Sequence, residues 1–144
     1  MTQITKPKLI HKKDFTKWHE VKTHVNNNPT ASVFFNEREV WYCHLGENVG
    51  FEMDGKGDSF LRPVVVVRKF NKETCWVVPL TSQIKASLYY HQISFGEGKQ
   101  SSANLSQFRL IDSKRLSHAI GKLSHEQFDE LIEKIVAILK KRVE

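Results

Sequence analysis

Apolar residues near the amino end of the chain recur at helical spacing. The segment DFTKWHEVKTHV, residues 14–25, places Phe15, Trp18, Val21 and Val25 three or four positions apart. Asp14 is in place as an N-cap, and the run NNNPT at 26–30 ends the helix. We therefore expect an N-terminal extension, residues 1–36, whose single amphipathic helix packs on the rest of the chain and buries Phe15 and Trp18.

A second helix is predicted at the carboxyl end. Ser124 and Gln127 form a capping-box pattern ahead of an apolar stripe. The stripe comprises positions 128, 131, 132, 135, 139 and 143. The basic run 140–142 follows, where positive charge complements the helix dipole; an RNA-binding patch is the alternative role for this run.

Between the two helices the pattern is that of short strands. Apolar runs bounded by Gly, Asn, Lys or Ser predict strands at 38–45, 62–70, 74–80, 87–95 and 103–111. The residues NKE at 71–73 are suited to a hairpin turn. Short strands, tight turns and one long glycine-bearing loop favour a small, strongly curved barrel. The fold class is thus α+β, mainly β with helices, and residues 37–144 form the main domain.

Composition limits the classes of function. The 144 residues suit a single domain, and 40% hydrophobic and 26% charged residues are ordinary for a globular protein. No apolar run approaches the ~20 residues of a membrane span, and no secretory signal is visible, so a cytoplasmic location is expected. The net charge of +6 fits either a polyanionic partner or a solvated surface.

The cysteines and histidines do not predict a metal site. Cys43 and Cys75 lie in strand-like segments and are expected to be buried thiols rather than a disulfide. The seven histidines are scattered and no C-x-x-C accompanies them. We therefore expect neither a metal nor a cofactor.

The stretch GFEMDGKG, residues 50–57, nearly matches the phosphate-binding pattern G-x-x-x-x-G-K-[ST]. Gly57 stands where that loop needs the Ser or Thr that holds magnesium. A helix should follow, whereas Pro63 and four consecutive valines favour a strand. We interpret the stretch as a loop between two strands, with Lys56 as a contact for an RNA backbone phosphate.

Polar residues at strand edges are the candidates for chemistry. Arg62 opens the valine strand, Thr81 and Ser82 end the VVPL strand, and Ser106 and Gln107 interrupt ANLSQFRLI. Each has an ordinary structural role open to it, as a solvated end or a turn. Together they would place a guanidinium, hydroxyls and an amide around one rim of a barrel.

These segments resemble the MazF/PemK family of toxins from type II toxin–antitoxin pairs. The similarity runs through REVWYCHLGENVGFE, RPVVVV, VVPLTS and LSQFRLIDSKRL to the closing helix, over residues 38–144. The spacing from G-x-E to R-P resembles a subgroup with a longer loop. The resemblance implies an SH3-like barrel, a homodimer, a cognate antitoxin and a metal-independent endoribonuclease that cuts single-stranded RNA at short motifs.

The resemblance also implies site residues. Arg62 matches the catalytic Arg of the R-P pair, Thr81 the catalytic Thr after the P-L pair, and Glu52 the Glu of G-x-E. Ser82, Ser106 and Gln107 are then RNA-binding candidates. Phe51 and Ser106 depart from members that have His and an acidic residue there, so a mechanism using those groups cannot operate unchanged.

Residue chemistry fits cleavage by the RNA's own 2′-OH. Arg62 can neutralise the phosphoryl charge, and Glu52 is the candidate general base in this sequence. The alternative function is a binding module on the same barrel, either non-catalytic or poisoning DNA gyrase as a relative of this fold does. The alternative for the 1–36 extension is a cap over the RNA groove or part of a dimer interface.

Overall fold

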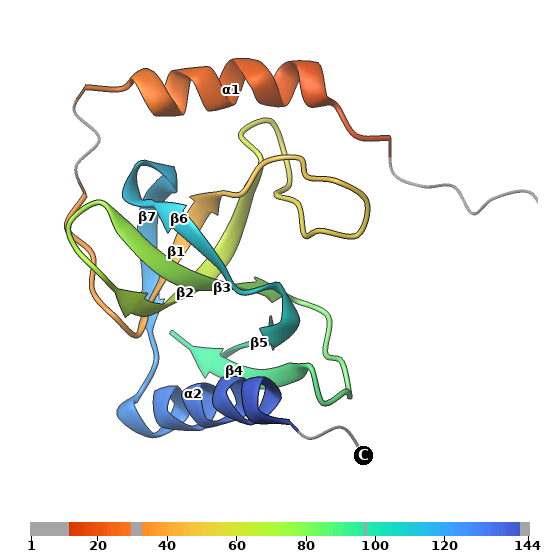
Figure 1. Cartoon of the computed structure of the whole chain (residues 1–144), viewed down its shortest axis with the longest axis vertical. Helices are drawn as coiled ribbons and strands as arrows, with labels where there is room; N and C mark the ends of the chain where they lie inside the picture. Colours follow the sequence, from red (N-terminus) through yellow and green to blue (C-terminus); the bar gives the residue numbers. More distant parts are fainter. Residues whose placement is uncertain (1–11, 30–32, 97, 142–144) are drawn as a thin grey trace, which may run out of the picture.

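A curved antiparallel sheet with a helix at each end makes up the protein. The computed structural model describes residues 12–29, 33–96 and 98–141 (Figure 1). Helices α1 (Phe15–Asn27) and α2 (His125–Lys140) lie at opposite ends of the molecule, with the sheet between them (Figure 1). This arrangement confirms the predicted α+β class. None of the helices in these ranges is long and apolar enough to cross a membrane.

Within the described residues the sheet has seven strands. They are β1 (Glu39–His44), β2 (Leu61–Lys69), β3 (Thr74–Thr81), β4 (Tyr90–Phe95), β5 (Lys99–Asn104), β6 (Arg109–Asp112) and β7 (Leu116–Lys122). Their order is β4-β5-β3-β2-β1-β7, and β6 also pairs with β3. No ladder joins β4 to β7 in the described part of the chain, so the sheet is open rather than closed into a complete barrel.

The valine run of β2 shows where the core lies. Val65 and Val67 belong to the apolar cluster that includes Leu131 and Ile135 of α2. Val64 and Val66 belong to a second cluster, on the other face of the strand. Because successive side chains of a strand point to opposite faces, an unbroken apolar run results from burial on both sides. The curved sheet therefore has a core on each face.

Both predicted helix starts are confirmed. The Asp14 side chain accepts from the Lys17 amide at 3.0 Å, and Ser124 Oγ accepts from the Gln127 amide at 3.1 Å. Gln127 Oε1 also accepts from the Ser94 amide of β4 at 2.8 Å, which joins α2 to the sheet. Trp18 is buried as predicted, but Phe15 is 51% exposed, so the prediction of its burial is wrong.

The apolar stripe of α2 is buried only in part. Leu131 and Ile135 are buried, with Phe128 and Ile132 packed against the same cluster, whereas Leu139 is 68% exposed. Positions 142 and 143 of the predicted basic run and stripe lie outside the described residues.

The strand predicted at 103–111 is wrong as one unit. The 3-10 turn η1 (Leu105–Gln107) divides it into the end of β5 and β6. Both parts pair with β3, through Leu80↔Ala103 and Val77↔Arg109. Between these two pairs β3 advances by three residues, from Leu80 to Val77, whereas the paired segment advances by six, from Ala103 to Arg109. The turn η1 accommodates the three extra residues.

One strand boundary and one whole strand also differ from the prediction. The strand expected at 87–95 begins at Tyr90, and β7 is absent from the prediction. A further 3-10 turn, η2 (Ser113–Arg115), leads into β7. The sequence SHAIGK has no apolar alternation, and β7 forms because it pairs with β1.

Candidate functional site

The ends of β2 and β3 meet at a surface hollow of ≈ 530 Å³ that contains four of the predicted site residues. These four are Lys56, Arg62, Thr81 and Ser82. The antiparallel pairing of β2 with β3 brings the start of one strand beside the end of the other, which places Arg62 near Thr81. We call this the first hollow.

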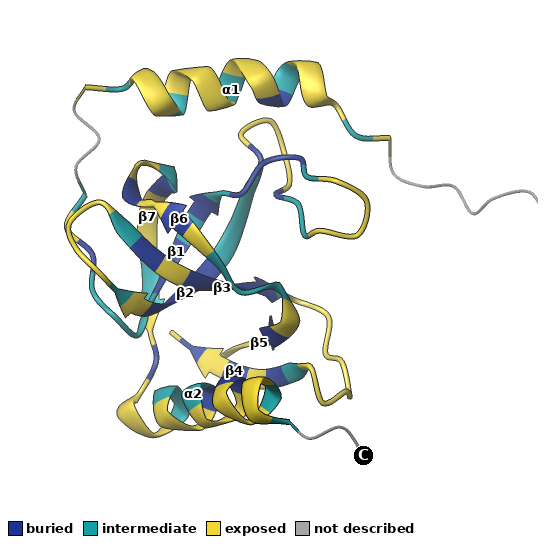
Figure 2. Cartoon of the chain, viewed as in Figure 1, coloured by how far each residue is buried: buried dark blue, intermediate teal, exposed yellow. Residues whose placement is uncertain are grey.

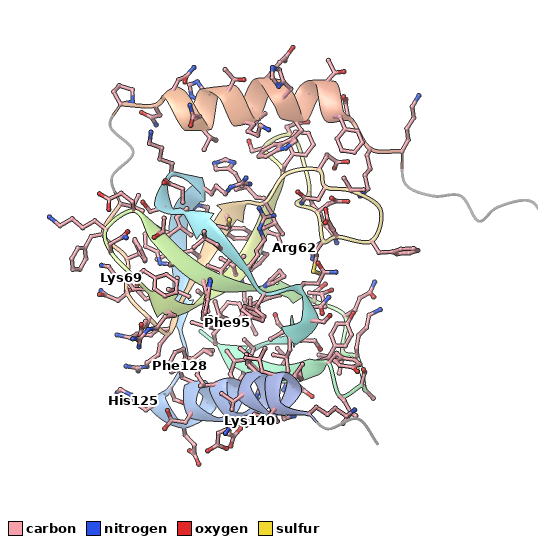
Figure 3. The ribbon with its side chains drawn as sticks, viewed as in Figure 1. Arg62, Lys69, Phe95, His125, Phe128 and Lys140 are labelled. Atoms are coloured by element: carbon pink, nitrogen blue, oxygen red, sulfur yellow. The ribbon has the colours of Figure 1, made fainter. Side chains whose placement is uncertain are left out.

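Arg62 is held in place by backbone carbonyls. Its Nε donates to the Asp54 carbonyl at 2.5 Å and its Nη1 to the Leu80 carbonyl at 3.1 Å. Burial lowers the pKa of Arg62 below its usual value, while the charge of Asp54 opposes that shift. Figure 3 shows Arg62 near the loop that joins β1 to β2, on the side of the sheet away from α2. A guanidinium fixed in this way is preorganised to bind an anion.

The charges of the first hollow favour an anionic ligand. Lys56, Arg62 and Lys99 are cations, and none of the described residues that line the hollow is acidic. Thr81 Oγ1 accepts from the Gln83 amide at 3.3 Å, which leaves its proton free to be donated. Ser82 is exposed beside it. Three cations and two hydroxyls fit a phosphodiester.

Sequence reasoning missed two residues of this hollow, Tyr42 and Lys99. Tyr42 of β1 pairs with Pro63 and its ring stacks on His118 of β7, with centroids 5.0 Å apart. Lys99 begins β5, a strand that the sequence pattern did not predict to start there. In the sequence, Tyr42 could have been singled out as an aromatic residue with a hydroxyl inside the predicted strand REVWYCHL. For Lys99 the sequence offered no signal beyond its charge.

The other three predicted residues, Glu52, Ser106 and Gln107, line a second hollow of ≈ 480 Å³. Gln107 Oε1 accepts from the Met53 amide at 3.0 Å and its Nε2 donates to the Phe51 carbonyl at 2.9 Å. Glu52 Oε1 accepts from the Val49 amide at 2.9 Å. In this structure Gln107 and Glu52 therefore hold the backbone of the β1–β2 loop, residues 45–60.

Ser106 is exposed and serves the turn that carries it. Its Oγ donates to Asn104 Oδ1 at 3.0 Å, so it links the end of β5 to η1. The structure thus separates the predicted site residues into two groups, one around Arg62 and one beneath the β1–β2 loop.

The stretch GFEMDGKG is part of a tight hairpin. Lys56 and Leu61 exchange both backbone hydrogen bonds, at 2.7 and 2.9 Å. A Cβ on Gly55 would lie 1.8 Å from the Phe60 carbonyl oxygen, so only glycine fits there. The hairpin leads into β2 and not into a helix, in agreement with the interpretation of this stretch as a loop.

Neither cysteine lines the first hollow, although Cys43 is paired with Arg62 in the β1–β2 ladder. Cys43 and Cys75 are free and buried, as predicted, and burial raises the pKa of each thiol to about 12. No group of three or more His, Cys, Asp or Glu side chains in the described ranges is arranged to hold a metal ion.

Comparison with known protein families identifies the family to which this chain belongs. A family model described as "PemK-like, MazF-like toxin of type II toxin-antitoxin system" matches residues 36–139, well over half of the chain. The protein therefore belongs to the PemK/MazF toxin family. No curated protein matches the chain in sequence.

Solved structures show the same fold at low sequence identity. MazF from Deinococcus radiodurans is 15% identical with a TM-score of 0.60, over 76% of this chain and 99% of that one. Toxin MazF-mt6 of Mycobacterium tuberculosis is 17% identical with a TM-score of 0.56, over 74% and 100%. A mycobacterial endoribonuclease in complex with its cognate antitoxin is 11% identical with a TM-score of 0.57, over 77% and 100%.

Proposed function

We propose that this protein is the toxin of a type II toxin–antitoxin pair and acts as a metal-independent endoribonuclease on single-stranded RNA at short sequence motifs. The observation that carries the proposal is the first hollow, where a fixed Arg62 adjoins Thr81 with Lys56 and Lys99 at the lining. Membership of the PemK/MazF family supports it, as does the description of a structural relative as an endoribonuclease.

The chemistry follows from the groups available. The 2′-OH of the RNA loses its proton to water and attacks the adjacent phosphorus, and the bond from phosphorus to the 5′-oxygen breaks as that oxygen takes up a proton from water. The products are a 2′,3′-cyclic phosphate and a 5′-OH that has gained a proton. DNA lacks the 2′-OH and is spared. Arg62 stabilises the charge on the pentacoordinate phosphorus, because its planar donors can bind two phosphoryl oxygens.

Thr81 and the two lysines complete the phosphate site in this proposal. The Thr81 hydroxyl donates to a phosphoryl oxygen, because that oxygen can only accept, and the bond from the Gln83 amide to Thr81 Oγ1 leaves the hydroxyl proton available. Lys56 and Lys99 bind neighbouring backbone phosphates and set the path of the RNA, while Ser82 lies exposed beside the scissile group.

We assign Glu52 to the loop and not to the proton transfer. Its carboxylate lines the second hollow with Ser106 and Gln107 and accepts from the Val49 amide. In the proposal Glu52 and Gln107 act on RNA only through the loop whose shape they maintain, and Ser106 supports the turn η1.

The proposal includes the partners and location that the family implies. These are a cognate antitoxin, a second copy of the chain in a homodimer, and the cytoplasm. The complex of the mycobacterial relative with its cognate antitoxin supports the first of these.

The test is cleavage of a long RNA in EDTA by the purified protein, with the product ends mapped. We expect cleavage at a short recurring motif. Arg62→Ala should lower the rate by ~10²–10³, the usual effect of removing a preorganised charge-stabilising donor. Circular dichroism should show that this variant is folded.

Arg68→Ala is the matched control, because Arg68 lies exposed on the same strand and outside the first hollow. Its cleavage rate should equal that of the wild type. RNA binding without cleavage would favour the non-catalytic alternative, and wild-type activity of Arg62→Ala would remove Arg62 from the mechanism.

A further inference from the structure

The segment that leads into α1 is bound to the β1–β2 loop by Lys13. Its Nζ lies 3.1 Å from Asp54 Oδ2 and donates to the Asn48 and Gly50 carbonyls at 2.5 and 2.8 Å. The two side chains of this ion pair are only 14% and 20% exposed, so water screens the interaction weakly. One lysine thus joins three residues of the loop.

Trp18 anchors α1 at the base of the same loop. It is buried, and its ring meets Phe60 edge to face with centroids 5.5 Å apart. A Cβ on Gly46 would lie 2.3 Å from the indole, so the glycine allows the close approach. Lys17 adds an exposed ion pair with Asp58 at 2.6 Å, which contributes little by itself.

Asp54 connects these contacts to the first hollow. Its carboxylate accepts from the Asn48 amide and pairs with Lys13, while its carbonyl accepts from Arg62 Nε. The position of the Asp54 backbone therefore depends on Lys13 on one side and determines where the Arg62 guanidinium lies on the other.

The exposure of α1 and its contacts indicate that the helix supports the β1–β2 loop rather than covering the candidate site. Figure 2 shows the helix exposed over most of its surface, and Trp18 is its one buried residue. No residue of α1 lines the first or the second hollow. The helix therefore does not cover the candidate RNA site; it contacts the segment that supports Arg62.

We propose that α1 and Lys13 form a clamp that fixes the β1–β2 loop and thereby positions Arg62. The catalytic consequence rests on the proposed endoribonuclease function, whereas the clamp itself does not. Lys13 is a positioning residue in this account, because it acts on Arg62 only through Asp54.

Amide exchange measured by NMR tests the clamp without RNA. In Lys13→Ala we expect exchange at the Asn48, Met53 and Gly55 amides to accelerate about tenfold or more, since a partly buried charged hydrogen-bond network is lost. Amides of the central strand β2 should keep wild-type rates. Lys12→Ala is the matched control: this neighbouring lysine is exposed, so its removal should leave loop exchange unchanged.

A second measurement tests the link to Arg62. Lys13→Ala should lower kcat for RNA cleavage about tenfold with a smaller change in KM, because the guanidinium is misplaced in the transition state. Lys13→Arg, which keeps the charge, should recover most of both the loop protection and kcat.

The outcomes separate the two proposals. Unchanged loop exchange in Lys13→Ala overturns the clamp, whether or not the protein cleaves RNA. Faster exchange with unchanged kcat overturns the positioning of Arg62. If the wild type itself does not cleave RNA, the proposed function fails while the exchange result still decides the clamp.

Discussion

Arg62 shows how one residue acquires a role from its neighbours. The motif R-P predicted the residue, but the carbonyls of Asp54 and Leu80 that hold its guanidinium come from a loop and from the neighbouring strand β3. A solvated arginine would sample many rotamers, whereas this one is restrained before any ligand binds. The restrained position of its guanidinium is therefore a property of the fold and not of the motif alone.

The substitution Glu52→Gln tests whether the Glu52 carboxylate takes part in proton transfer. Glu52→Gln should leave the RNA cleavage rate within a few-fold of wild type, because the amide oxygen can still accept from the Val49 amide. The pH–rate profile should also be unchanged. Loss of the acid limb of that profile in Glu52→Gln would instead identify the carboxylate as the general base.

Sequence motifs could predict candidate site residues but not how the fold groups them. Arg62, Thr81 and Ser82 were predicted together and lie together, since they occupy the ends of two strands that pair directly. Glu52 and Gln107 lie in the second hollow because the path of the β1–β2 loop depends on distant contacts. Such contacts leave no trace in local sequence pattern.

At the scale of elements, strands with strong local signals were predictable and strands made by pairing were not. The valine strand β2 and the hairpin at 71–73 follow from β-branched runs and from Asn71, whose Oδ1 accepts from the Thr74 amide at 2.7 Å. Strand β7 lacks such a signal, and η1 interrupts a segment whose pattern favours a strand. Tertiary pairing overrides local preference in both.

Helix α2 provides a matched pair of substitutions. Leu131→Ala should lower the free energy of unfolding by about 2–5 kcal/mol, because this side chain is fully buried in the cluster between α2 and the sheet. Leu139→Ala, on the same helix but 68% exposed, should change it by less than about 0.5 kcal/mol. Urea unfolding measures both, and equal effects would contradict the packing of α2 described above.

At the scale of the whole molecule, one buried histidine couples folding to pH. Burial lowers the pKa of His91 below 6.5, and the charge of Lys134 acts in the same direction. Glu130, whose Oε2 lies 3.9 Å from His91 Nε2, opposes the shift. The folded protein thus holds His91 neutral at a pH where the unfolded chain takes up a proton.

The free energy of unfolding should therefore decrease as pH falls from about 6.5 through the lowered pKa of His91. His91→Gln should reduce this slope in urea titrations at pH 7 and pH 5. His19→Gln is the control, because His19 lies exposed on α1. An undiminished slope in His91→Gln would show that another group causes the pH dependence.

The residues that stabilise the fold and the residues of the candidate site lie in different parts of the molecule. The two apolar clusters hold the sheet and α2 together. The cations of the first hollow lie outside these clusters, Lys56 in the β1–β2 loop and Arg62 and Lys99 at the starts of β2 and β5, where substitution disturbs little of the core. Variants at the hollow should therefore lose activity and remain folded, which makes activity measurements on them interpretable.

The central claim is that this protein cuts RNA by directing its 2′-OH at the adjacent phosphate. The most direct measurement uses an RNA oligonucleotide that contains one mapped cleavage site, in EDTA, beside a copy with a single 2′-deoxy substitution at the attacking nucleotide. We predict that the all-ribose strand is cut to a 2′,3′-cyclic phosphate and a 5′-OH, and that the substituted strand stays intact. Cleavage of the substituted strand at the same bond would contradict the account.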